Sequence, residues 1–332
     1  MIATYLNKKT FTPINYVNDI WANSTHIVSA CAAASTTGKV PVYSYTEAGA
    51  MTHVSYSSTG GYSFGVSGNG EYCVHPGLYR VYSYRVYSTK FINTDDYTID
   101  NMWQWKPYCG ANNRVYCARD KLLILNMDAT GNLTLINESI TPSARCVHSF
   151  VENDFEWLVV PNYDYANPIN IYKIETPFAY TEFQSIVKPY ISATQIVQSC
   201  YITKKWLVIG YEIAAGAGSI SVYARKGDLT YEYKASTVTN CVVYGLYCTG
   251  STLIASLYTD GLTTYAINGD GTLTQVENDD RGHQYGACFF TNNKLFVSGR
   301  DGAVMIYQIL PPPVGAGSVF YGPFQGPFRG PF

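Results

Sequence analysis

The sequence predicts an all-β fold: a single seven-bladed β-propeller closed by its N-terminal strand and followed by an extended C-terminal tail. The first observation is a recurring phrase, in which a Tyr inside an apolar strand precedes a turn and then Leu-Thr or Tyr-Thr. TTYAINGDGTLTQV at 263–276 and SVYARKGDLTYEY at 221–233 are clear copies. The second is a repeat period in the low forties with every unit built from strands, which is typical of propellers. The third is that no helical period of ten residues occurs.

The copies of the phrase can be aligned on one central residue, which is Tyr in all copies but one. These residues are Tyr5, Tyr43, Tyr87, Leu125, Tyr172, Tyr223, Tyr265 and Tyr307. The steps between them are 38, 44, 38, 47, 51, 42 and 42 residues. This alignment places a copy at each end of the chain.

An apolar strand precedes the Tyr strand in each unit and occurs seven times, at 27–33, 72–74, 115–118, 157–160, 206–209, 253–256 and 295–298. The outer-strand phrase that follows the turn, such as LTQV, also occurs seven times. The Tyr strand occurs eight times, with a copy at each end of the chain. The sequence therefore predicts seven blades.

Ring closure follows from the last unit. After AVMIYQIL at 303–310 the chain runs into three prolines and supplies no outer strand, because Pro cannot continue a ladder. We therefore expect the N-terminal segment TFTPINY to supply it, which removes an exposed sheet edge. The predicted propeller domain is 1–310, with blades at 16–60, 61–102, 103–140, 141–187, 188–237, 238–280 and 281–310 plus 8–15.

The remaining residues, 311–332, form a predicted tail outside every blade. Gly-Pro-Phe occurs three times at four-residue spacing, and so much Gly and Pro favours polyproline-like or irregular extended structure. We expect a docking peptide whose aromatic side chains fill pockets on a neighbouring subunit; packing on its own propeller is the alternative. The predicted partner-binding residues are Phe320, Tyr321, Phe324, Phe328 and Phe332.

Composition points to contact with other molecules. Charged residues make up only 14% of the chain and the net charge is −2, whereas 31 of the 332 residues are Tyr. This charge balance argues against nucleic acid and anionic membranes as partners. Tyr supplies amphipathic contact area at interfaces, but it also fills strands because of its β-propensity. No apolar run is long enough to span a bilayer, so no membrane insertion is expected.

The nine cysteines do not form a zinc pattern, because there is no C-x-x-C and no His at ligand spacing from a Cys pair. Cys146, Cys200, Cys241 and Cys288 are predicted at similar points of successive repeats, where reduced Cys acts as a small buried hydrophobe. The acidic pairs Asp95–Asp96 and Asp279–Asp280, and also His283, are predicted in turns. We expect no metal and no cofactor.

The repeats resemble the lactonase-type seven-bladed propellers (6-phosphogluconolactonase-like, or YVTN-type), to which TTYAINGDGTLTQV is similar. The resemblance covers most of 103–310. In enzymes of that family a His, a Glu and two Arg gather at the mouth of the central channel and act on a lactone. The resemblance of ARCVHSFVENDFEWLVVPN (144–162) implies His148 as the His, and that of KWLVIGYE (205–212) implies Glu212 as the Glu.

The two family arginines have no counterpart in the alignment. Their positions fall near Gln195–Gln198 and near Leu257–Tyr258. Without them the site lacks the cations that would bind a carboxylate and stabilise a developing oxyanion. His148 and Glu212 remain an acid/base pair only under the enzyme hypothesis, since each is also compatible with a structural role in the channel.

We therefore expect a non-enzymatic structural or binding propeller in a larger assembly, with a virus or phage particle as its setting. Its partners would be other protein subunits, including its own copies, and glycans stacked on exposed aromatic rings. Two alternatives stay open: a lactonase-like or cycloisomerase-like enzyme that uses His148 and Glu212, and a scaffold that binds a peptide or glycan. The N-terminus lacks the pattern of a secretory signal, so we expect synthesis in the cytosol.

Overall fold

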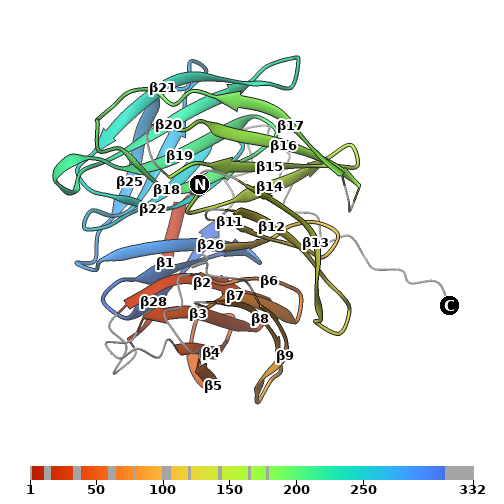
Figure 1. Ribbon diagram of the computed structural model, residues 1–332. Coiled ribbons are helices and arrows are strands. Elements are labelled where there is room, and N and C mark those ends of the chain that lie inside the picture. Colours follow the sequence, from red (N-terminus) through yellow and green to blue (C-terminus); the bar gives the residue numbers. More distant parts are fainter. Residues whose placement is uncertain are drawn as a thin grey trace.

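The computed structural model contains seven four-stranded antiparallel sheets arranged around a centre (Figure 1). The prediction of an all-β, seven-bladed propeller is thus confirmed. The structure describes residues 2–10, 16–32, 39–58, 65–77, 79–98, 106–118, 121–140, 144–163, 166–176 and 179–310. The tail at 311–332, with Phe320, Tyr321, Phe324, Phe328 and Phe332, lies outside the described residues.

The first strands of neighbouring blades contact one another and so surround the central channel. For blades I to VII they are β2 (Tyr16–Ala22), β6 (Ser67–Asn69), β10 (Pro107–Cys109), β14 (His148–Glu152), β18 (Ile196–Ile202), β22 (Val243–Thr249) and β26 (Tyr285–Thr291). The second strands are β3 (His26–Ala32), β7 (Tyr72–Pro76), β11 (Arg114–Ala118), β15 (Phe155–Pro161), β19 (Trp206–Glu212), β23 (Thr252–Leu257) and β27 (Lys294–Gly299). All seven coincide with the apolar strands predicted from the sequence.

The third and fourth strands complete each blade toward the outside. The third strands are β4 (Lys39–Tyr45), β8 (Arg80–Val86), β12 (Lys121–Met127), β16 (Ile169–Thr176), β20 (Gly218–Arg225), β24 (Gly261–Ile267) and β28 (Ala303–Leu310). The fourth strands are β5 (Met51–Ser58), β9 (Phe91–Thr98), β13 (Leu133–Ile140), β17 (Ala179–Ile186), β21 (Tyr231–Thr239), β25 (Leu273–Asp279) and, in blade VII, β1 (Ile2–Thr10). One 3₁₀ turn, η1 (Ala214–Gly216), joins β19 to β20.

The recurring Tyr marks a β-bulge that all seven blades share. In every blade the fourth strand carries one extra residue opposite the same position of the third strand. These positions are Tyr43, Tyr84, Leu125, Tyr172, Tyr223, Tyr265 and Tyr307. Six of these seven residues are the ones that the sequence alignment identified, and the exception is in blade II.

Two residues of that alignment were wrong. In blade II the equivalent residue is Tyr84, not Tyr87, because the tyrosines of RVYSYRVY allow a three-residue slip that only pairing resolves. Tyr5 does not belong to a third strand at all. It lies on β1, a fourth strand, directly opposite Tyr307, with the two rings edge to face at 5.6 Å.

Closure of the ring by the N-terminal strand is confirmed, but with a different segment. β1 pairs with β28 from Ile2 opposite Leu310 to Thr10 opposite Ala303, whereas the sequence predicted 8–15. The earlier register is favoured because it places Ala3 and Tyr5 against the core of blade VII. The closing strand therefore contributes packing as well as ladder hydrogen bonds.

The core consists of layers between adjacent blades, so each sheet buries both faces. In the run WLVI of β19, Leu207 and Ile209 pack with blade IV, whereas Trp206 and Val208 pack with blade VI. This explains why the second strands are continuous apolar runs rather than alternating ones. All nine cysteines are free, and seven of them are buried in these layers.

The predicted equivalence of four cysteines was wrong in detail. Cys200 and Cys288 lie on first strands, whereas Cys146 and Cys241 lie two residues before one. Burial raises the pKa of the Cys288 thiol to about 12 and that of Cys200 well above its ordinary value. These thiols therefore remain protonated and pack as small apolar groups.

A buried carboxylate joins blades III and IV. Glu156 forms an ion pair with Arg114 at 3.0 Å, and the two side chains are 1% and 5% exposed. Glu156 also accepts hydrogen bonds from Tyr116 Oη (2.6 Å), Ser149 Oγ (2.5 Å) and the Ala111 N–H (3.0 Å). Four donors on both blades thus satisfy one carboxylate, which compensates for its desolvation.

We predict that Glu156→Gln lowers the free energy of unfolding by about 3–5 kcal/mol, because Arg114 is left buried without its counter-charge. Urea unfolding monitored by Trp fluorescence measures this change. Glu71→Gln is the matched control, since Glu71 and its partner Arg85 are solvent-exposed, and it should leave the midpoint unchanged. Equal effects of the two variants would contradict the assigned role of Glu156.

Candidate functional site

Polar side chains gather at the end of the channel where the first strands begin and the second strands end. Because neighbouring strands are antiparallel, these two kinds of strand end lie at the same edge of each sheet. We call this end the channel mouth and define it by Asp19, Lys106, Arg145, Tyr163, Gln198, Glu212, Tyr244, Tyr258 and Arg300. Six of the seven blades contribute at least one of these residues.

One half of the mouth is a hydrogen-bonded chain across blades IV and V. Arg145 donates from Nη1 to Gln198 Oε1 (2.9 Å) and from Nη2 to Tyr163 Oη (2.9 Å). Gln198 in turn donates from Nε2 to Glu212 Oε2 (2.5 Å). The Arg145 guanidinium lies 4.2 Å from the centre of the Tyr163 ring, and burial lowers its pKa.

Gln198 reaches this network because of a bulge. The β18–β19 register passes from Val197 to Ser199 and leaves Gln198 out of the ladder. The first strands of blades I and VI skip a residue in the same way, at Asn18 and Tyr244. Bulges of this kind redirect a side chain next to functional sites, and here they place polar groups at the mouth.

The other half of the mouth is an Arg–Tyr stack from blades VI and VII. The Arg300 guanidinium lies 4.7 Å from the Tyr244 ring centre and 5.7 Å from that of Tyr258. The two tyrosine rings meet edge to face at 5.7 Å. Cation–π contacts hold the guanidinium over these rings.

Lys106 of blade III reaches across to the half of the mouth that blades VI and VII form. Its Nζ donates to the Tyr244 carbonyl oxygen at 3.4 Å, which links blade III to blade VI. Its charge also acts on Asp19 of blade I, where burial raises the carboxyl pKa and Lys106 opposes that rise. Asp19 accepts from the Ile20 N–H (3.0 Å) and the Val66 N–H (3.2 Å). The Lys106 ammonium group and the Asp19 carboxyl therefore interact electrostatically at the mouth.

The structure supplies cations where the sequence alignment found none. Arg145 contacts Gln198, and Arg300 stacks on Tyr258, which are the two regions where the family arginines were expected. Both arginines come from neighbouring blades, so an alignment of corresponding strands could not find them. Their only sequence signal is that each lies just outside a strand, in ARC and in GRDG.

His148 does not lie at this mouth network. Its ring lies between those of Tyr108 (4.7 Å) and Tyr201 (3.9 Å), in a run of aromatic rings that continues through Tyr247 to Phe290. Each ring comes from the first strand of a successive blade, III to VII. His148 Nδ1 accepts from the Ile202 N–H at 3.4 Å, and burial lowers the pKa of His148 to about 3.

The strand registers separate His148 from Glu212. His148 pairs with Val159 of the neighbouring strand. When blades IV and V are aligned on their shared bulge, Val159 is equivalent to Val208. Glu212 lies four residues beyond Val208, or roughly 13 Å along the strand. The structure therefore brings Glu212 together with Gln198 and Arg145, and does not bring it together with His148.

The other polar residues noted in the sequence have local partners. Asp95 and Asp96 lie within β9 rather than in a turn; Asp95 accepts from the Leu133 N–H (2.6 Å) and Asp96 pairs with Arg80 (2.5 Å). His283 contacts Asp301 at 2.6 Å. In the described ranges, no three His, Cys, Asp or Glu side chains lie close enough together to hold a metal ion.

Comparison with known proteins shows the fold alone. No family model matches the sequence, and no curated protein matches it. The structure is similar to the WD40 β-propeller domain of Doa1, with a TM-score of 0.67 and 11% identity over 92% of this chain and 96% of that one. It is also similar to a putative 6-phosphogluconolactonase from Bacteroides fragilis, with a TM-score of 0.66 and 10% identity over 79% and 84%.

A computationally designed protein, Ika8, has a TM-score of 0.57 to this chain at 10% identity, over 92% and 99% of the two chains. The propeller resemblance read from the sequence is thus confirmed at the level of architecture. None of the helices in the described part of the chain is long and apolar enough to cross a membrane.

We predict that His148→Phe makes stability less sensitive to acid. The folded state keeps the His148 ring neutral, while the unfolded chain protonates it below its ordinary pKa near 6.5. The free energy of unfolding that the neutral His148 ring contributes above pH 6.5 is therefore lost as the pH falls toward 3. Between pH 7 and pH 5 the wild type should lose about 2 kcal/mol more than the variant. Parallel plots of unfolding free energy against pH would contradict this assignment.

Proposed function

We propose that this protein is a non-enzymatic binding propeller that forms part of a larger assembly. The channel mouth is the observation that carries the proposal. Arg145, Arg300, Tyr163, Tyr244 and Tyr258 form a compact surface in which the arginines are held by hydrogen bonds or by stacking on tyrosine rings. Arg and Tyr are the side chains that dominate binding energy at protein interfaces, and strand ends hold them in place.

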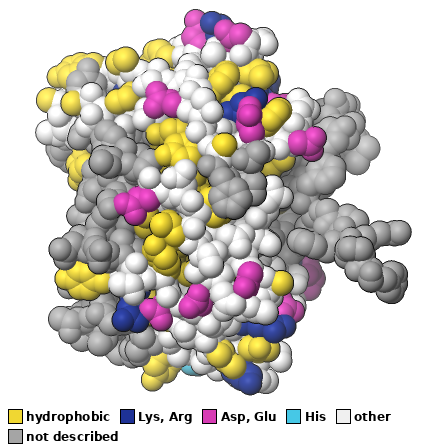
Figure 2. Space-filling model, turned by 45° about the vertical axis from the view of Figure 1, so that its right-hand side comes forward, with side chains coloured by type: hydrophobic (Ala, Val, Ile, Leu, Met, Phe, Trp, Pro, Cys, Tyr) yellow, Lys and Arg dark blue, Asp and Glu magenta, His cyan; other side chains and the backbone are white. Residues whose placement is uncertain are grey.

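The remaining surface is compatible with this role. On the face in Figure 2, acidic and basic side chains are scattered among uncharged and hydrophobic ones. Among the described residues, eleven tyrosines are buried, whereas Tyr56, Tyr79, Tyr190 and Tyr233 are exposed. Strand filling therefore accounts for more of the tyrosine content than surface contacts do. In the described part of the chain, Val187 is the most exposed large apolar side chain, at 84%.

We further propose a virus or phage particle as the setting, with the Gly-Pro-Phe tail docked on a neighbouring subunit. Low surface charge and the patterned tail support this setting. Partners would be other protein subunits, including copies of the same chain, while glycans would stack on exposed tyrosines. Synthesis in the cytosol and a site without cofactor are part of the same proposal.

Deletion of 318–332 should abolish tail-dependent association and leave the propeller folded, because β1 closes the ring without the tail. Size exclusion with light scattering measures the mass of the full chain and of the truncated chain across a concentration series. Circular dichroism checks that the truncated chain keeps its strands. A full-length chain that stays monomeric at every concentration would count against an assembly component.

A lactonase-like activity is the second candidate, and one observation favours it: Arg145 and Arg300 restore cations beside Glu212 and Tyr258. Such an enzyme would use Glu212 at the mouth rather than the pair His148 and Glu212. A peptide- or glycan-binding scaffold that uses the same mouth is the third candidate, and it differs from the first in needing no assembly.

We expect no hydrolysis of δ-valerolactone above the buffer rate, measured by pH-stat with the full chain. In the binding role, Glu212 orients Gln198 and activates no water. Turnover that disappears in Glu212→Gln and persists in Glu175→Gln would establish the enzyme instead. Glu175 serves as the control because it is paired with Lys173 on an outer part of blade IV.

A further inference from the structure

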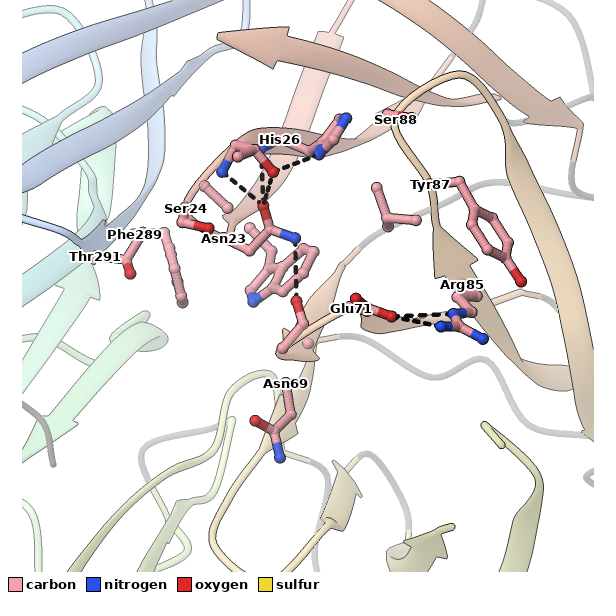
Figure 3. Close-up of a pocket in the computed structure, with 16 residues that line it drawn as sticks. Asn23, Ser24, His26, Asn69, Glu71, Arg85, Tyr87, Ser88, Phe289 and Thr291 are labelled. Atoms are coloured by element: carbon pink, nitrogen blue, oxygen red, sulfur yellow. Dashed lines mark hydrogen bonds and ion pairs between the residues drawn. The ribbon is translucent and has the colours of Figure 1, made fainter. Parts of the chain in front are cut away.

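A hollow opens on the face opposite the channel mouth, where the first strands end. It has a volume of about 550 Å³, which is within the usual range of about 300–1,000 Å³ for ligand pockets. Its walls come from blades VII, I and II: the β2–β3 turn, the β6–β7 turn, and the ends of β8 and β26. Figure 3 shows Phe289 and Thr291 on one side of it, with Arg85 and Tyr87 on the other.

Aromatic side chains from all three blades border the hollow: Tyr87, Phe289 and Trp21, of which Trp21 is only 2% exposed. Gly68 lies beneath Trp21, where an added Cβ would be only 2.5 Å from the indole ring. In each blade, one first-strand residue pairs with the second-strand residue that lies opposite the bulge position of the third strand. This first-strand residue is Gly68 in blade II and is larger than Gly in the other six blades. In blade II the Trp21 indole therefore occupies the space that a first-strand side chain takes in the other blades.

Polar groups at the rim are already oriented. Arg85 donates to Glu71 Oε2 from both Nε (3.1 Å) and Nη2 (2.7 Å), and its guanidinium lies 4.8 Å from the Tyr87 ring centre. Asn23 donates to the Gly70 carbonyl oxygen at 3.0 Å, which ties the two turns together. The hollow is therefore an aromatic groove with a fixed polar edge.

The chain leaves the propeller beside this hollow. Near the end of β28, the Ile309 N–H donates to the Asn293 carbonyl oxygen at 2.8 Å, and the Gln308 side chain donates to the same atom at 2.9 Å. Asn293 is in the β26–β27 turn, two residues after Thr291, which lines the hollow. The 22 residues that follow Leu310 therefore start on the face that carries the groove.

We propose that this hollow is the receptor for the Gly-Pro-Phe segment of a neighbouring copy of the chain. Aromatic-lined grooves bind proline-rich segments because the polyproline conformation is preformed and loses little entropy. The segment 318–332 repeats Gly-Pro-Phe three times, which supplies both proline rings and phenyl side chains. This inference rests on the proposed tail-mediated assembly and adds the site that receives the tail.

The first residues of the tail favour a neighbouring copy, rather than the same chain, as the propeller that receives the Gly-Pro-Phe segment. Pro311, Pro312 and Pro313 follow Leu310 directly, and consecutive prolines extend by about 3.1 Å per residue and stay stiff. The three prolines therefore span roughly 9 Å and resist a tight reversal of the chain directly after Leu310. A second propeller facing it is then better placed to receive the repeats.

The test uses a fluorescent peptide of residues 318–332 and the propeller truncated after residue 317. Anisotropy should show saturable binding that weakens at least tenfold in Tyr87→Ser, since that ring forms one wall of the groove. Tyr79→Ser is the matched control, because Tyr79 is an exposed tyrosine of the same blade at its opposite end, and it should bind like the parent. Absence of binding, or equal loss in both variants, would overturn the proposal.

Light scattering of the full chain identifies the source of the segment. A neighbouring copy predicts concentration-dependent association that is lost in Tyr87→Ser and kept in Tyr79→Ser. A full chain that stays monomeric and no longer binds the peptide would show docking within one chain and overturn the proposed source. Association that depends on the tail but is unchanged in Tyr87→Ser would overturn the receptor site while leaving the proposed assembly intact.

Discussion

Each blade of this propeller must bury both faces against its two neighbours, and the rest of the structure depends on that constraint. A blade such as V has one apolar layer against blade IV and another against blade VI. No blade is complete without the next, so the ring is stable only when it is closed. The pairing of β1 with β28 meets this requirement by joining the two ends of the chain within one sheet.

The same packing divides the central channel into two chemically different levels. Aromatic rings from successive first strands, from Tyr108 to Phe290, form a belt of tilted, edge-to-face and stacked contacts, and burial keeps His148 neutral within it. At the strand ends, bulges release Gln198 and Tyr244 from the ladder and place polar groups at the mouth. Burial thus makes His148 part of the packing, whereas the mouth keeps the groups that a ligand can contact.

Differences among the blades create the features that a perfect repeat would lack. Blade II has a three-residue first strand with Gly68 beneath Trp21, and a hollow opens at that place. Blades III and IV are joined by the buried Glu156 carboxylate instead of apolar contact alone. Blade VII is built from both ends of the propeller, so Ile2 and Leu310 lie opposite each other in one sheet, on the face that carries the hollow.

The sequence by itself determined the number of blades, the second strands and the closure by the N-terminus, because these follow from local β-patterning and from the prolines after Leu310. Only the tertiary structure decided the register of β1, the equivalence of Tyr84 rather than Tyr87, and the separation of His148 from Glu212. It alone brought Arg145 to Gln198 and Arg300 to Tyr258. The physical reason is that bulges and contacts between blades join residues far apart in the chain, and a pattern within one repeat carries no information about its neighbours.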